Sequence, residues 1–127
     1  MGAAAGAGRD LSDLITLPLP LFGTLIRNVA VVRFSRTLST LLSSGAPLIQ
    51  SLGIVENVVN NVVIAGAIEE AREAIKGGKS IAEPFRKNRV FPPIVVHMIA
   101  VGETSGSLEQ MLMKVSQAYE DEVETTV

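Results

Sequence analysis

The sequence predicts an all-α domain, folded as an antiparallel bundle of about six helices. Apolar residues recur at spacings of three and four along most of the chain, and no stretch alternates with the period of two that is typical of strands. Glycine and proline divide the chain into segments of helical length. Aromatic residues make up 4% and tryptophan is absent, so we expect a core of aliphatic side chains and methionine. The 127 residues suffice for one such domain.

Residues 1–18 are predicted to form a flexible arm or an expression remnant, and residues 19–127 the helical domain. The arm begins with small residues that follow no period. Its second half is apolar but ends in a segment that Pro18 and Pro20 interrupt, and proline lacks the amide that a helix interior requires. The first helix is therefore expected from about Thr24.

Three helices are predicted in the first part of the domain. The first has one apolar stripe, formed by Val31, Phe34, Leu38, Leu41 and Leu42. Gly45 can adopt the left-handed conformation that ends a helix, and Pro47 suits the first turn of the next. The third helix follows Asn60 or Asn61, because either asparagine can cap it. The pair Gly77-Gly78 ends this helix.

Three further helices complete the predicted bundle. The capping-box pattern S-x-x-E at 80–83 indicates a short fourth helix. The two prolines at 92–93 begin a fifth helix, and Gly106 is placed to end it. The pattern S-x-x-Q at 107–110 begins the last helix, which carries acidic residues towards the C-terminus.

Composition excludes several classes of function. A formal net charge of −2 argues against a dedicated nucleic-acid binder, which would carry a basic excess. Because the chain contains no cysteine, disulfides, thiolate metal sites and cysteine nucleophiles are excluded. No stretch resembles the roughly 20 apolar residues of a membrane span. The mean hydropathy of +0.37 is high for a soluble domain and indicates a surface for a partner.

One short motif imitates a nucleotide-binding loop. Gly78-Lys79-Ser80 matches the end of the pattern G-x-x-x-x-G-K-[ST], which cradles phosphate after a strand. The first glycine of that pattern would stand at position 73, where this chain has Glu73, and a helix precedes the motif. A carboxylate in the cradle would repel phosphate, so we expect a helix-ending turn followed by a capping serine.

No catalytic, cofactor or metal site is predicted. His97 is the only histidine, and a general base needs an orienting carboxylate and a nucleophile nearby. Acidic residues gather at the end of the chain, at Glu120, Asp121, Glu122 and Glu124. A hard cation prefers six to eight oxygens, which one helix face cannot supply alone. The sequence leaves open whether Glu103 or a second subunit completes such a site, and a solvated face is the simpler expectation.

Basic residues cluster in one short segment, opposed by Glu83: Lys79, Arg86, Lys87 and Arg89. Such a cluster can orient a partner protein or face anionic lipid headgroups. A second group of candidate partner-binding residues lies in the glycine-rich block between the last two helices: Gly102, Glu103, Ser105 and Gly106. A tight connection between helices explains the glycines but not Glu103.

The order of several motifs resembles the F-domain of the platform proteins of type II secretion and type IV pilus assembly. The resemblance runs from Leu19 to the C-terminus. It rests on Pro20-Leu21-Phe22-Gly23, Arg33-Phe34-Ser35-Arg36 through Ser44-Gly45-Ala46-Pro47-Leu48, Phe91-Pro92-Pro93, Met98-Ile99-Ala100-Val101-Gly102-Glu103-Thr104-Ser105-Gly106-Ser107-Leu108, and Tyr119-Glu120-Asp121-Glu122-Val123-Glu124.

The resemblance implies a non-catalytic scaffold domain on the cytoplasmic face of the bacterial inner membrane. It implies the second of two cytoplasmic copies within a membrane-embedded protein, self-association, and contacts with the assembly ATPase and pilin-like or other inner-membrane subunits. The alternative is a soluble helical adaptor without a membrane link. The sequence does not decide between secretion and pilus assembly, nor which surface meets which partner.

Overall fold

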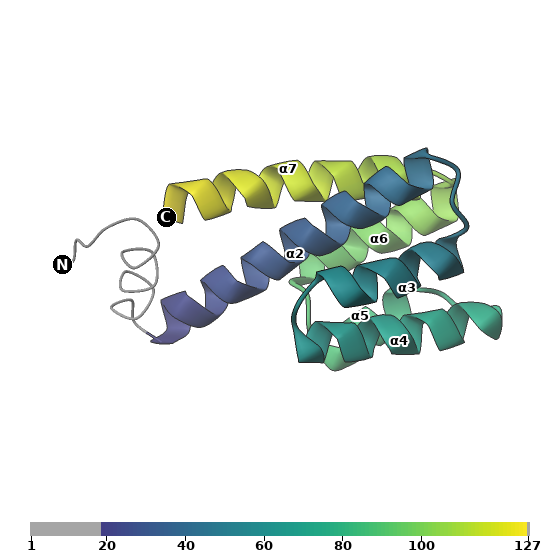
Figure 1. Ribbon diagram of the computed structural model, residues 1–127, viewed down its shortest axis with the longest axis horizontal. Coiled ribbons are helices and arrows are strands. Elements are labelled where there is room, and N and C mark those ends of the chain that lie inside the picture. The colour runs from purple at the N-terminus through teal and green to yellow at the C-terminus, as the bar shows by residue number, and fades with distance from the viewer. Residues whose placement is uncertain (1–18, 127) are drawn as a thin grey trace.

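The structure, a computed structural model, describes residues 19–126, and the expected arm over residues 1–18 lies outside the described residues. Six helices and no strand occupy the described part of the chain, which confirms the predicted all-α class (Figure 1). The helices are α2 (Leu19–Ser43), α3 (Leu48–Val58), α4 (Val62–Lys76), α5 (Ala82–Asn88), α6 (Pro93–Ser105) and α7 (Leu108–Thr126).

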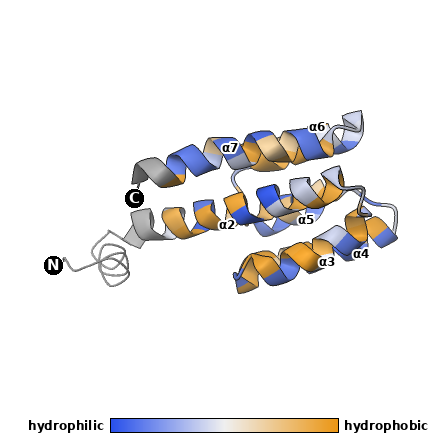
Figure 2. Ribbon diagram, turned by 45° about the horizontal axis from the view of Figure 1, so that its top comes forward, coloured by the Kyte–Doolittle hydropathy of each residue, from blue (hydrophilic) through white to orange (hydrophobic). Residues whose placement is uncertain are grey.

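The helices form a closed ring of neighbours. Each helix packs against the next one along the chain, and α7 returns to lie beside α2 (Figure 1). As a result, α2 begins and α7 ends at the same end of the bundle, which we call the open end. The α2–α3, α4–α5 and α6–α7 connections lie at the opposite end, which we call the distal end. Figure 2 shows that α7 is largely hydrophilic towards its C-terminal end, whereas α3 is largely hydrophobic.

Three phenylalanines form the centre of the core, which the expectation of an aliphatic core missed. Phe34 of α2, Phe85 of α5 and Phe91 are buried, and their ring centroids lie 4.9 to 5.3 Å apart. Each buried phenylalanine contributes about 1.5–3 kcal/mol by leaving water. The aliphatic residues predicted for the core surround these rings, among them Leu38 and Leu112.

The predicted boundaries hold except at the first helix. Helix α2 begins at Leu19 rather than near Thr24, because a proline in the first turn replaces an amide that would have no partner within the helix. Asn61 rather than Asn60 caps α4, and its side-chain oxygen accepts a hydrogen bond from the Ile64 amide at 3.1 Å. Among the described residues, no helix has both the length and the apolar character needed to cross a membrane.

Candidate functional site

Glu103 of α6 caps the neighbouring helix α5. One carboxylate oxygen accepts a hydrogen bond from the Ser80 hydroxyl at 2.7 Å, and the other accepts a hydrogen bond from the Ile81 amide at 2.9 Å. The Ser80 hydroxyl oxygen accepts a hydrogen bond from the Ala82 amide at 3.1 Å. The N-terminal amides of a helix lack internal partners and carry partial positive charge, so the carboxylate supplies both bonds and charge. This contact gives Glu103 a structural role, which the tight connection between α6 and α7 alone did not explain.

The capping box predicted at 80–83 does not form as expected. Ser80 does bond a helix amide, but Glu83 turns to Arg86, with 2.9 Å between oxygen and nitrogen. The amide of Ile81 is held by Glu103 instead. A carboxylate from another helix thus binds an amide at the start of α5, the one next to the Ser80 amide that the local glutamate would have bound.

The rest of the glycine-rich block sets the crossing of α6 and α7. A Cβ atom on Gly102 would lie 2.8 Å from the Leu108 Cα, closer than real Cβ contacts, so only glycine fits here. Gly106 ends α6 with a φ of +76°, the left-handed conformation that favours glycine. The Ser105 hydroxyl donates to the Val101 carbonyl at 2.8 Å and lies 2.6 Å from the Ser107 hydroxyl. Each residue of the block therefore has an internal contact or conformational role.

The turn that resembled a nucleotide-binding loop is a helix end. The amide of Gly78 donates a hydrogen bond to the Ile75 carbonyl at 2.9 Å, and the amide of Lys79 donates one to the Ala74 carbonyl at 2.8 Å. These amides point back into α4 and cannot cradle a phosphate. The hydroxyl of Ser80, which would face the metal ion in such a loop, is bound to Glu103.

The basic cluster is partly neutralised. Arg86 pairs with Glu83, and Lys87 pairs with Glu70 at 3.2 Å. Hydrogen bonds from Lys87 and then Asn88 lower the pKa of the exposed Glu70 carboxyl. Among residues 23–123, no carboxylate forms an ion pair with Lys79 or with Arg89.

The cluster is also divided between two grooves that share no lining residue. Lys79 and Lys87 line a groove of about 750 Å³ that also holds several carboxylates: Glu69, Glu70, Glu73 and Glu83. Arg86 and Arg89 line a second groove of about 660 Å³. Arg27 and His97 join them there, and none of the described residues that line it is a carboxylate. We call this second groove the arginine groove.

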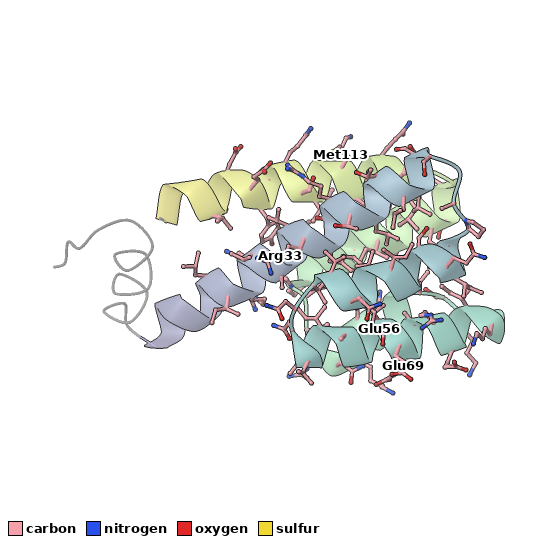
Figure 3. The ribbon with its side chains drawn as sticks, in the orientation of Figure 1. Arg33, Glu56, Glu69 and Met113 are labelled. Atoms are coloured by element: carbon pink, nitrogen blue, oxygen red, sulfur yellow. The ribbon has the colours of Figure 1, made fainter. Side chains whose placement is uncertain are left out.

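The acidic end of α7 does not assemble a metal centre with Glu103. Among residues 23–123, no group of three potential ligands that could hold a metal ion comes together. Glu120 instead pairs with Arg36 of α2, which joins the first and last helices. Glu103 lies at the distal end, where it is bound to α5. Like Arg36 and Glu120, Arg72 of α4 and Glu56 of α3 form an ion pair between two helices, at 3.3 Å. Figure 3 shows Glu56 on the α4 side of α3.

Comparison with known proteins identifies the family. The family described as type II secretion system (T2SS), protein F, matches residues 34–127. The chain is 42% identical over 120 residues to the type IV pilus assembly protein PilC of Myxococcus xanthus, covering 94% of this chain and 29% of that protein. It is 42% identical over 125 residues to PilC of Thermus thermophilus, covering 94% of this chain and 30% of that protein.

The likeness extends to a secretion protein. The type II secretion system protein F of Pseudomonas aeruginosa is 36% identical over 107 residues, which cover 84% of this chain and 26% of that protein. The chain therefore spans less than a third of the length of the relatives named here. Since the family match covers most of the chain and includes the whole glycine-rich block, the chain belongs to the type II secretion system protein F family.

Proposed function

We propose that this chain is a non-catalytic cytoplasmic scaffold domain of an inner-membrane platform protein, serving type II secretion or type IV pilus assembly. It binds the assembly ATPase and neighbouring subunits and corresponds to the second of two cytoplasmic copies. The observation that carries the proposal is the closed ring of helices, in which α2 begins and α7 ends at one end (Figure 1). The remaining length of the protein can then attach at the open end and leave the distal end to partners.

A binding role rather than catalysis is supported by how the distinctive residues are used. Glu103 bonds Ser80 and Ile81, and Gly102 permits the close crossing of α6 and α7. These residues hold helices together instead of converging on a place for a reacting atom. His97 lines the arginine groove, in which no side chain supplies the carboxylate that would orient a general base.

Lys79 is the residue of the basic cluster best placed to meet the ATPase. It lies in the α4–α5 connection at the distal end, is exposed, and makes no ion pair with any described residue. Arg86 and Lys87 already pair with carboxylates, so their replacement would also change the domain itself. Lys79 therefore gives the clean test of the proposed contact.

The test compares the affinity of the ATPase from the same assembly for the unchanged chain and for Lys79→Glu, by calorimetry. Charge reversal at an interface places like charges together, and we expect affinity to fall on the order of tenfold. Lys114→Glu is the matched control, because Lys114 is also exposed but lies on α7. Equal affinities of the two variants would remove Lys79 from the interface, and no binding by the unchanged chain would refute the proposed partner.

Self-association is the second part of the proposal. Two apolar side chains of α3 are exposed, Ile54 at 48% and Val58 at 42%, and such residues are common where copies of a protein meet. We expect concentration-dependent dimers in sedimentation velocity, weakened by Ile54→Ser. A chain that stays monomeric at millimolar concentration would refute this part alone.

A further inference from the structure

The arginine groove brings together basic side chains from three helices, α2, α5 and α6. Arg27 comes from α2, Arg86 from α5, and Arg89 stands at the end of α5 with a left-handed φ of +54°. His97 of α6 completes the lining. The sequence cluster contained only Arg86 and Arg89 of these residues, whereas Arg27 is far from them along the chain.

This accumulation is unlike the rest of the charged surface. In the groove between α4 and α5, glutamates face Lys79 and Lys87. Arg72 and Arg36 likewise have carboxylate partners. Among the described residues, no carboxylate lines the arginine groove, although Arg86 pairs at its edge with Glu83, which lines the neighbouring groove. Like charges held together repel one another, and an anion removes this cost.

The walls of the groove strengthen its attraction for an anion. Besides the basic residues, it is lined by Phe91, Pro92, Pro93 and Val96. Apolar walls lower the local dielectric constant and concentrate the field of the guanidinium groups. The guanidinium fork of arginine matches the paired oxygens of a phosphate group and can bind them through two parallel hydrogen bonds.

We propose that the arginine groove is a binding site for a phosphate group, held chiefly by Arg27 and Arg89. Arg86 contributes more weakly, because one of its terminal nitrogens already pairs with Glu83 at 2.9 Å. The phosphate can belong to an anionic lipid headgroup or to a free phosphate. This site goes beyond the proposed scaffold role and involves no contact with the ATPase.

The surroundings of the groove favour the lipid as the source of the phosphate. The groove lies towards the open end: Arg27 is about 12 Å along α2 from Leu19, and α6 begins at Pro93. The apolar part of the groove lining includes the exposed Pro93, and the exposed Ile94 (55%) follows it in the first turn of α6. Arginines beside exposed apolar residues are the combination that binds an anionic membrane surface.

The test uses the whole chain and vesicles of phosphatidylglycerol with phosphatidylcholine, with pure phosphatidylcholine vesicles and inorganic phosphate as separate probes. The variant Arg27→Gln/Arg89→Asn removes two charges, and asparagine tolerates the left-handed backbone at position 89. Lys76→Gln/Lys114→Gln, which replaces two exposed lysines outside the groove, is the control with the same net charge. Circular dichroism and the thermal midpoint verify that all variants fold.

We expect cosedimentation with the anionic vesicles alone, weakened about 25-fold by the groove variant, at about fivefold per basic side chain, and less than threefold by the control. Saturable binding of inorganic phosphate that the groove variant abolishes, without vesicle binding, assigns the site to free phosphate. Equal losses in both variants, or no binding of either probe, would overturn the proposal. Because no ATPase is present, any of these results leaves the scaffold role to its own test.

Discussion

Replacing Glu103 by alanine should destabilise the domain by about 2 kcal/mol, even though the side chain is only half-buried. The carboxylate accepts hydrogen bonds from the Ile81 amide at 2.9 Å and from the Ser80 hydroxyl at 2.7 Å. Hydrogen bonds to a charged acceptor contribute about 1.5–3 kcal/mol each, but the exposed Ser80 hydroxyl can turn to water after the substitution. Most of the loss therefore comes from the partly buried Ile81 amide.

The assay is urea unfolding followed by circular dichroism, with thermal unfolding as a second measure. For a domain of this size, about 2 kcal/mol corresponds to a fall in the midpoint temperature of about 7 to 9 °C. Hydrogen exchange adds a local measure, since the Ile81 amide should exchange faster in Glu103→Ala while amides of α2 follow the global stability. Glu103→Gln keeps one acceptor oxygen and should lose about 1 kcal/mol.

Glu109→Ala is the control, because it removes the same charge from an exposed position in the first turn of α7. It should lower stability by less than about 1 kcal/mol, since an exposed carboxylate at a helix start contributes about 0.3–1 kcal/mol. Equal unfolding midpoints for Glu103→Ala and Glu109→Ala would refute the reasoning, since the carboxylate would then contribute nothing to the start of α5.

Three other substitutions test separate features of the packing by the same unfolding measurements. Gly102→Ala should cost about 1–3 kcal/mol, because its Cβ would meet the Leu108 Cα at 2.8 Å; an unchanged midpoint would mean that α6 and α7 separate without loss. Gly66→Ala should add about 0.5–1 kcal/mol, because it lies inside α4 with no atom within 4 Å of the new Cβ; a loss would contradict the helix assignment there. Ser51→Ala should leave stability unchanged or raise it by about 1 kcal/mol, since this buried hydroxyl has no hydrogen-bond partner among the described residues; a large loss would reveal a bound partner.

The sequence was informative about the helices because their signals are local. Apolar spacing identified the faces of the helices, and a side chain such as Asn61 or a left-handed glycine such as Gly106 marked their ends. The start of α2 was wrong by several residues, because a proline that breaks a helix interior is tolerated in its first turn.

The sequence was less informative about the site because its contacts are not local. Glu103 was singled out, but the cap that it forms on Ile81 joins residues 22 apart, which no spacing rule predicts. The basic cluster was identified by proximity along the chain, which could not foresee that Arg89 would share a groove with Arg27 from another helix. Residues of one short helix can face different neighbours, so adjacency in sequence is a poor guide to a common surface.

The pairing of α2 with α7 also determines when the domain can finish folding during synthesis. Arg36 and Glu120, which bond across this pair, are 84 residues apart. At about 5–20 residues per second, the ribosome needs between about 4 and 17 seconds to deliver the partner after Arg36 has been made. Until then the middle helices can cover part of α2, but the face that will meet α7 is exposed to water and to other nascent chains. A ribosome that stalls before α7 would thus release a chain with an uncovered apolar face, a natural target for a chaperone.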